Sequence, residues 1–184
     1  MTSAKSEIET IGTKHIHKTK WINVLENDVR FADGTTSTFT TIEKPDYAAV
    51  IAIDADGLLY LVEQYRYAIA RRSLEIPMGA THDGEPFDPL RTARKELEEE
   101  TGLIADEMRL LGSLVSSGGY MKQQCYAFIA KNLRIGIRAP EQAEQGMTVH
   151  KHSISEVEDM IRTGRIDNVA TIAAISLARL HQLI

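Results

Sequence analysis

The sequence predicts an α/β fold, for two reasons. Residues 47–53 and 58–62 are short apolar runs rich in alanine, valine, isoleucine and leucine, and such runs are typical of buried strands at the centre of a sheet. A helix with clear start and stop signals is expected at residues 89–101, and two further helical segments follow near the C-terminus. Strands followed by helices favour a sheet with helices packed against it.

The composition is that of one compact soluble domain. The chain has 184 residues, of which 43% are hydrophobic and 26% are charged, enough for a sizeable core. A formal net charge of −5 argues against nonspecific nucleic-acid binding, which needs a basic surface. We expect no membrane association, because the sequence has no apolar run of about 18 residues and no signal-peptide pattern after Met1.

Cys125 is the single cysteine of the sequence. One cysteine excludes an intramolecular disulfide framework and fits a reducing compartment, so a cytoplasmic location is expected. Because Cys125 lies in a strand-like segment, we interpret it as a small core residue rather than a nucleophile.

The first 45 residues are expected to form an antiparallel β extension of the main body, which spans 46–184. Asp33-Gly34 is a good hairpin signal. Strands with β-branched and aromatic side chains are predicted on both sides of it, at 21–25, 29–31 and 37–42.

The helix expected at 89–101 has a recognisable beginning and end. Asp88 can accept the free N–H groups of the first turn, Pro89 fits the first helical position, and Gly102 ends the helix. The stripe that packs on the core is predicted from apolar residues at helical spacing, namely Leu90, Ala93, Leu97 and Thr101.

The same helix carries glutamates near its C-terminal end. Glu96, Glu99 and Glu100 fall within about a third of the helix circumference, away from most of the apolar stripe, whereas Glu98 stands apart. Like charges at i,i+4 cost roughly 0.2–0.5 kcal/mol per pair, and the helix dipole adds to the repulsion. One interpretation is a solvated helix face. The other is a site for Mg²⁺, Mn²⁺ or Ca²⁺, which prefer hard oxygen ligands.

A glycine-rich loop before the helix favours the metal site. Gly79, Asp83 and Gly84 suggest a tight loop in which backbone groups approach a ligand closely. Such a loop, joined to an acidic helix, suits an enzyme that acts on Mg²⁺-bound phosphates.

Residues 79–103 resemble the Nudix box. Gly79 and Glu85 match its first half with the expected five-residue gap, and the run ELEEETGL matches its second half. Nine residues rather than seven separate Glu85 from the position of the family arginine, and that position holds Lys95. Lysine keeps the charge but lacks the planar fork that grips two carboxylates, so Arg94 is a possible substitute.

The Nudix resemblance implies a metal site and a catalytic glutamate. The implied ligands of Mg²⁺, or of Mn²⁺, are the backbone carbonyl of Met78 and three helix glutamates, Glu96, Glu99 and Glu100. The family also places a catalytic glutamate on a mobile acidic loop, which in this chain is 138–147. Glu141 and Glu144 both qualify, and Glu99 is a third candidate to orient or deprotonate the attacking water.

The segment before the box is similar to the ADP-ribose pyrophosphatase branch of the family, through the runs QYRY and LEIPMG. Guanidinium groups match phosphate oxygens, so Arg66, Arg71 and Arg72 suit a phosphate-bearing substrate. Arg66 is preferred, and the alternative is that two of them only pair with surface carboxylates. Glu75 is expected to help orient the substrate. Ser117 lies in the loop that helps to select the substrate in this branch, although a glycine follows it where the branch has proline.

Three strands and two helices are expected downstream of the box. The strands are predicted at 107–115, 123–130 and 147–152. Ser153 or Ser155 can cap a helix that runs through Ile161, and Asp167 is predicted to cap the closing helix.

The resemblance implies the overall architecture and the reaction. The architecture is a Nudix α/β/α sandwich with a mixed sheet, whose N-terminal β extension exchanges between the subunits of a homodimer. The reaction is Mg²⁺-dependent hydrolysis of ADP-ribose, or of a related nucleoside diphosphate sugar, which for ADP-ribose gives AMP and ribose 5-phosphate. The alternatives are a broad-specificity nucleoside diphosphate sugar hydrolase and a Nudix domain that senses a nucleotide without hydrolysing it.

Overall fold

The structure, a computed structural model, describes residues 7–81, 86–139 and 144–184. The chain divides into two units, each made of two segments: Met1–Pro45 with Val115–Gln123, and Asp46–Leu114 with Gln124–Ile184. A loop from the middle of the chain, 115–123, therefore belongs with the N-terminal segment, a grouping that the sequence did not suggest. Among the described residues, no helix is long and apolar enough to cross a membrane.

The first unit is a four-stranded sheet with the strand order β1-β2-β3-β9. Its strands are β1 (Ile8–Lys18), β2 (Asn23–Phe31), β3 (Thr36–Glu43) and β9 (Met121–Lys122). Strand β2 runs without a break where two short strands were expected. Gly34 adopts φ 88° in the turn before β3, a conformation that favours glycine, and the Thr35 N–H donates to the Asp33 side chain at 2.9 Å. The predicted hairpin is confirmed.

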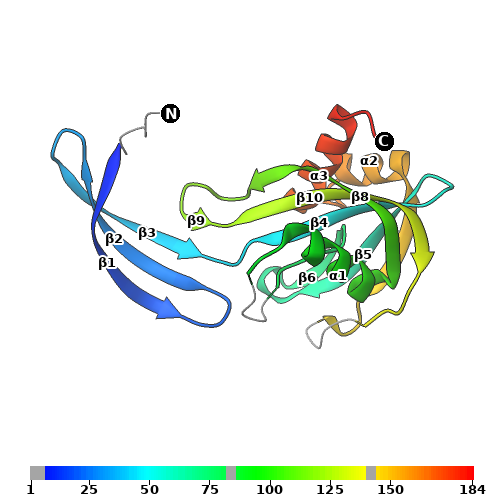
Figure 1. Cartoon of the computed structure of the whole chain (residues 1–184), viewed down its shortest axis with the longest axis horizontal. Helices are drawn as coiled ribbons and strands as arrows, with labels where there is room; N and C mark the ends of the chain where they lie inside the picture. The colour runs from blue at the N-terminus through cyan, green and yellow to red at the C-terminus, as the bar shows by residue number, and fades with distance from the viewer. Residues whose placement is uncertain (1–6, 82–85, 140–143) are drawn as a thin grey trace. The chain divides into compact units, whose positions relative to one another are not determined.

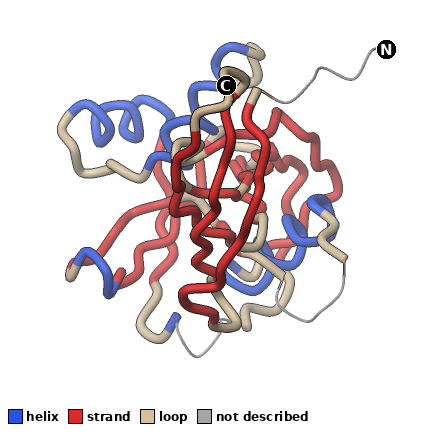
Figure 2. The backbone as a smooth tube through the Cα atoms, turned by 90° about the vertical axis from the view of Figure 1, so that its left-hand side faces the viewer, coloured by secondary structure: helices blue, strands red, loops and turns tan. Residues whose placement is uncertain are grey.

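The second unit holds a seven-stranded sheet with α-helices on both faces (Figures 1 and 2). Its strands are β4 (Tyr47–Ile53), β5 (Leu58–Arg66), β6 (Arg71–Glu75), β7 (Met78–Gly79), β8 (Leu103–Val115), β10 (Gln124–Ile135) and β11 (Thr148–Ser153). Its helices are the 3-10 turn η1 (Tyr67–Ile69) and the α-helices α1 (Pro89–Thr101), α2 (Ile154–Arg162) and α3 (Val169–Leu180). Five strands follow the order β11-β5-β4-β10-β8, while β6 pairs with β5 and β7 with β4. The sheet is mixed, because β4 runs parallel to β10 and antiparallel to β5.

Strand β4 contributes to two cores, because its side chains alternate between the faces of the sheet. On one face, Ala48, Val50 and Ala52 pack in a cluster with Ala93 and Leu97 of α1. Every one of these five side chains has a relative exposure of 0%. Helix α1 is thereby fixed on this face of the sheet.

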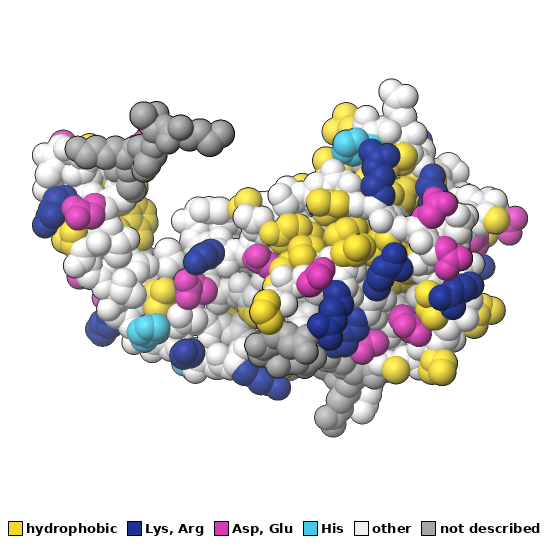
Figure 3. Space-filling model, in the orientation of Figure 1, with side chains coloured by type: hydrophobic (Ala, Val, Ile, Leu, Met, Phe, Trp, Pro, Cys, Tyr) yellow, Lys and Arg dark blue, Asp and Glu magenta, His cyan; other side chains and the backbone are white. Residues whose placement is uncertain are grey.

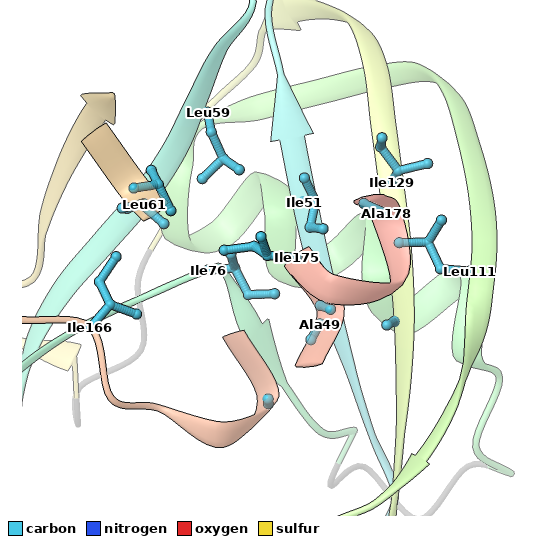
Figure 4. Packing of buried hydrophobic residues seen from close by; sticks show 14 of the residues in the cluster. Ala49, Ile51, Leu59, Leu61, Ile76, Leu111, Ile129, Ile166, Ile175 and Ala178 are labelled. Atoms are coloured by element: carbon cyan, nitrogen blue, oxygen red, sulfur yellow. The ribbon is translucent and has the colours of Figure 1, made fainter. Parts of the chain in front are cut away.

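The opposite face of β4 points toward α2 and α3. Ala49 and Ile51 share a cluster with Val157 of α2 and Ala178 of α3, and Figure 4 shows Ile51 and Ala178 within it. One helix on one face and two on the other make the α/β/α sandwich that was predicted.

The buried stripe of α1 differs from the predicted one. Its buried residues are Thr92, Ala93, Glu96, Leu97 and Glu100, whereas Leu90 is 42% exposed. At 100° per residue, the observed stripe is rotated by roughly 70° from the predicted one. The prediction for Leu90 was wrong because the glutamates were placed away from the packed stripe, whereas Glu96 and Glu100 are buried.

The cap of α3 is also one residue away from its predicted position. The Asn168 side chain accepts from the Thr171 N–H at 2.9 Å, whereas Asp167 forms an ion pair with Arg71. The cap of α2 agrees with one of the two predicted candidates, since Ser153 and Glu156 form a capping box.

Acidic and basic side chains are interspersed on the face of the protein drawn in Figure 3. Exposed ion pairs include Arg134 with Asp106 at 3.1 Å and Lys151 with Asp54 at 3.2 Å. Pairs of this kind contribute about 0–1 kcal/mol each, so the stability of the second unit rests mainly on its two apolar clusters.

Candidate metal and diphosphate site

Helix α1 presents two glutamates toward the protein interior. Glu96 and Glu100 lie one turn apart and have relative exposures of 7% and 1%, although glutamates are rarely buried unless they are paired. The Asp88 side chain caps the helix by accepting from the Arg91 N–H, and Gly102 ends it at φ 75°. These caps fix where both carboxylates lie along the chain.

Glu144 joins the two helix glutamates from a distant part of the sequence. One carboxylate oxygen from each of Glu96, Glu100 and Glu144 lies within 4.8 Å of the others. Glu144 precedes β11, and its carbonyl accepts the Met147 N–H at 3.0 Å. We call Glu96, Glu100 and Glu144 the carboxylate trio. Three negative charges at this separation repel one another, and a bound cation would offset that repulsion.

The environment of Glu100 is unfavourable to a charged carboxylate. Burial raises the pKa of Glu100 well above its ordinary value of 4.5, and the charges of Glu144 and Glu96 raise it further. The Met78 N–H, which donates to Oε2 at 3.1 Å, and Arg66 oppose this rise. The other oxygen, Oε1, is buried and accepts no hydrogen bond from the described residues. A coordinated cation would satisfy this oxygen.

Gly79 makes room for the Glu96 carboxylate. It lies on β7, opposite Ala48 of β4. A Cβ placed on Gly79 would lie 2.2 Å from Oε2 and 2.7 Å from Oε1 of Glu96, so a side chain would take the space of the carboxylate. The trio offers only hard oxygen donors for a cation. One of them, Oε1 of Glu100, accepts no hydrogen bond from the described residues, and Gly79 leaves space for the Glu96 carboxylate. These donors fit Mg²⁺ or Mn²⁺.

Arg66 and Glu75 form a two-bonded ion pair beside the trio. Arg66 Nε donates to Oε1 at 3.1 Å and Nη2 donates to Oε2 at 2.5 Å. Burial by itself lowers the pKa of Arg66, but the bonds to Glu75 and the charges of Glu75, Glu100 and Glu144 raise it above its ordinary value. The Arg66 side chain remains 38% exposed. Glu75 therefore orients a permanently charged guanidinium that can still contact a phosphate.

The other predicted ligands and bases are Glu99, the Met78 carbonyl and Glu141. Glu99 is not part of the trio, and it pairs with Lys95 at 3.6 Å. The Met78 N–H faces Glu100, and its predicted role as a carbonyl ligand stays a prediction. Glu141 and Glu85 lie outside the described residues.

The other two arginines predicted to suit a phosphate are also held by carboxylates. Arg71 pairs with Asp167, and Arg72 pairs with Glu63 at 3.0 Å, as the alternative interpretation of these arginines expected. Arg94 donates to the Ala105 carbonyl at 2.7 Å, so the structure gives it a backbone partner.

Two other residues were singled out in the sequence, Ser117 and Cys125. Ser117 belongs to the first unit, where its carbonyl accepts the N–H groups of Tyr120 and Met121. Cys125 is a core residue of β10 with a relative exposure of 1%. Burial raises the pKa of its thiol to about 11, which agrees with a core role and not with a nucleophile.

One residue next to the trio, Arg138, was not predicted from the sequence. Arg138 Nε donates to the carbonyl of Glu100 at 2.6 Å, and Nη2 donates to the carbonyl of Met147 at 2.8 Å. Its partners are backbone groups, and backbone carbonyls carry no sequence signal.

The family of the chain follows from this fold and site together with a match of its sequence. Residues 43–166 match the family model described as the NUDIX domain. The chain belongs to the Nudix family, and within it the helix glutamates of the box supply two members of the trio.

Several relatives match most of the chain. A methanol dehydrogenase activator of Bacillus methanolicus is 31% identical over 177 residues, which cover 96% of this chain and 95% of that protein. An ADP-ribose pyrophosphatase of Mycobacterium tuberculosis is 30% identical over 94% of this chain and 83% of that protein. An ADP-ribose pyrophosphatase of Bacillus subtilis is 32% identical over 70% of this chain and 69% of that protein.

A solved structure shares the fold. The crystal structure of an ADP compounds hydrolase superposes with a TM-score of 0.82 over 97% of this chain and 95% of that chain, at 17% sequence identity. At this identity the likeness concerns the fold, and it agrees with the α/β/α architecture described above.

Proposed function

We propose that the chain hydrolyses the diphosphate bond of ADP-ribose, or of a related nucleoside diphosphate sugar, to a nucleoside monophosphate and a sugar phosphate. The observation that carries this proposal is the carboxylate trio, with its buried and unbonded Glu100 oxygen, beside the exposed guanidinium of Arg66. The names of the Mycobacterium tuberculosis and Bacillus subtilis relatives support ADP-ribose as the first substrate to test.

The trio would hold a divalent cation, Mg²⁺ or Mn²⁺. A cation bound there neutralises charge on the diphosphate oxygens and makes phosphorus more susceptible to attack. Glu96 and Glu100 supply oxygens from buried positions on a capped helix, so their positions are set before a ligand arrives. The Met78 carbonyl and Glu99 remain candidate ligands from the Nudix resemblance.

Arg66 would bind the phosphate oxygens of the substrate. Glu75 accepts two of its hydrogen bonds, which fixes the plane of the guanidinium and leaves its exposed edge for the ligand. This assigns Glu75 the part of orienting Arg66, and through it the substrate. Ser117 stays a predicted contributor to substrate selection.

A glutamate would orient or deprotonate the attacking water. The candidates are Glu141, Glu144 and Glu99. The position of Glu144 within the trio supports its presence where the reaction takes place, and the choice among the three requires kinetic measurement.

Turnover of a panel of nucleoside diphosphate sugars, measured with Mg²⁺ and with EDTA, tests the proposal. Products can be followed as phosphomonoesters by phosphatase-coupled phosphate release. We expect metal-dependent hydrolysis of ADP-ribose, and a loss of about 100-fold or more in Glu100→Gln, because that change removes a ligand charge. Glu98→Gln is the matched control on the same helix, since Glu98 is outside the trio.

The outcomes separate the alternatives. Equal rates on many sugars would indicate a broad-specificity hydrolase. Nucleotide binding without metal-dependent turnover of any substrate would indicate a sensing domain and refute the hydrolase proposal.

We also propose a cytoplasmic homodimer built through the first unit. Five large apolar side chains of this unit, Ile8, Ile11, Ile16, Trp21 and Phe39, are 39–49% exposed. Leu25 and Val29 are the buried apolar side chains among the described residues of this unit, so it has little core of its own and would gain from association. Light scattering of the purified chain gives the mass, and a monomer would refute the proposal.

A further inference from the structure

The position of Glu144 needs an explanation, because this residue lies outside the regular elements and beside two like charges. Residues 144–147, which begin with Glu144, form a turn before β11. In this turn the Met147 N–H donates to the Glu144 carbonyl at 3.0 Å. Repulsion from Glu96 and Glu100 acts to move the Glu144 carboxylate away. The charge of Arg66 attracts the Glu144 carboxylate, and the turn that carries it has further backbone contacts.

Arg138 connects this turn to the end of α1. Its Nε donates to the Glu100 carbonyl at 2.6 Å, and its Nη2 donates to the Met147 carbonyl at 2.8 Å. The Glu100 carbonyl is one of the last four of the helix, which lack partners within the helix. A cation is also favoured at a helix C-terminus. Arg138 thus ties the helix that carries two of the trio to the turn that carries the third.

The backbone beside Arg138 strengthens this link. The Ala139 N–H donates to the Glu99 carbonyl at 3.1 Å, and the Gly136 N–H donates to the Gly102 carbonyl at 2.7 Å. Residues 136–139 therefore run along the C-terminal end of α1. Because the backbone is hydrogen-bonded on both sides of Arg138, at Gly136 and Ala139, the position from which its guanidinium reaches the turn is restrained.

Arg72 holds the same turn from the sheet. Its Nη2 donates to the Gly146 carbonyl at 3.0 Å and to the Glu63 carbonyl at 2.7 Å. Its Nε donates to the Glu63 side chain at 3.0 Å. Gly146 has φ 78°, a conformation in which a side chain would be strained. Two consecutive carbonyls, those of Gly146 and Met147, are thus held by Arg72 of β6 and by Arg138, which follows β10.

We propose that Arg138 and Arg72 are positioning residues that hold Glu144 within the carboxylate trio. Neither side chain is required to touch the cation or the substrate. Each acts through backbone carbonyls two or three residues after Glu144, and Met147, with a relative exposure of 5%, packs the turn onto the protein. The inference rests on the proposed function only in requiring that the trio binds a divalent cation.

Binding of Mn²⁺ to the full-length chain without substrate is the primary test. Free Mn²⁺ can be measured by electron paramagnetic resonance in titrations of the wild type, Arg138→Met and Arg72→Met. Loss of a partner that orients a ligand typically weakens metal binding by 10–100-fold, so we expect a decrease of roughly 10-fold in each variant. Arg134→Met is the matched control, because Arg134 is an exposed residue of β10 paired with Asp106, and its affinity should equal that of the wild type.

A second measurement follows the turn itself. Amide hydrogen exchange at Met147 should become faster in Arg138→Met and in Arg72→Met, because the turn that its N–H closes loses a support. Arg138→Lys keeps the charge but cannot bridge two carbonyls as the planar fork does. This milder variant should show an intermediate Mn²⁺ affinity and provides the test if Arg138→Met does not fold.

The results separate this inference from the proposed function. Wild-type affinity for Mn²⁺ in Arg138→Lys and Arg72→Met, or a wild type that does not bind Mn²⁺, would overturn the positioning role. If the variants bind Mn²⁺ weakly while the wild type binds it and hydrolyses no nucleoside diphosphate sugar, the positioning role stands and the hydrolase proposal fails.

Discussion

Replacing Gly79 with alanine probes the metal site with a single added methyl group. The new Cβ would lie 2.2 Å from Oε2, 2.4 Å from Cδ and 2.7 Å from Oε1 of Glu96. Real Cβ atoms essentially never approach another atom closer than 3.0 Å, and ordinary van der Waals contact begins at 3.4 Å, so the carboxylate must move by about 0.8–1.2 Å. The backbone of Gly79 is not in the left-handed region, and alanine therefore adds a clash without backbone strain.

This displacement should cost function much more than stability. Mg²⁺ accepts ligands only near 2.0–2.1 Å and in near-octahedral geometry, and a misplacement of about 1 Å can lower a rate by about 100-fold, or about 2.7 kcal/mol. The clashing atoms are the end of a flexible side chain. Alanine also loses less conformational entropy than glycine on folding, by about 0.4–1 kcal/mol. We expect the free energy of unfolding to change by less than about 1 kcal/mol.

Mn²⁺ titration and urea unfolding in EDTA check both parts of this prediction. Gly112→Ala is the matched control, since its Cβ would contact the nearest atom, Leu177 Cδ1, at 3.5 Å. Gly79→Ala with wild-type affinity for Mn²⁺ would refute the view that Glu96 is a ligand held in the space beside Gly79. A variant that fails to fold would refute the view that the Glu96 carboxylate can yield at low cost.

Three other predictions concern single residues. Because the pKa of Glu100 is raised in the fold, ionisation of Glu100 destabilises the metal-free protein as the pH rises above its ordinary pKa of 4.5. Glu100→Gln should therefore raise the melting temperature in EDTA at neutral pH, and the difference from the wild type should vanish at about pH 4. A lower melting temperature of the variant at neutral pH would contradict this. With its thiol pKa raised to about 11, Cys125 should react with a disulfide reagent only as fast as the protein unfolds, and rapid labelling of the native chain would show that it is accessible. Asn168→Ala should lower the free energy of unfolding by about 1 kcal/mol, because the substitution removes the cap of α3. Asp167→Ala, which loses an exposed ion pair, should lower the free energy of unfolding less in the same urea titration. Equal losses would mean that the cap is assigned wrongly.

The local elements were largely predictable from the sequence. The bounds of α1 follow from Asp88, Pro89 and Gly102, and the structure has the same bounds. Caps, turns and alternation act over a few residues, so nearby side chains are enough to predict them. The same reasoning failed for Leu90 and Asp167, where the choice between adjacent helix faces or adjacent caps depended on what the helix packs against.

The sequence by itself determined that Glu96 and Glu100 share one side of a helix, because 3.6 residues per turn leaves no other arrangement for an i,i+4 pair. Only the tertiary structure decided that this side is buried, that Gly79 leaves space for one carboxylate, and that Glu144 joins both. Likewise, only the fold brings Arg66 to Glu75 and Arg138 to two backbone carbonyls. The physical reason is that distances between elements are set by how the sheet and helices pack, and backbone partners have no side-chain identity from which a sequence could reveal them.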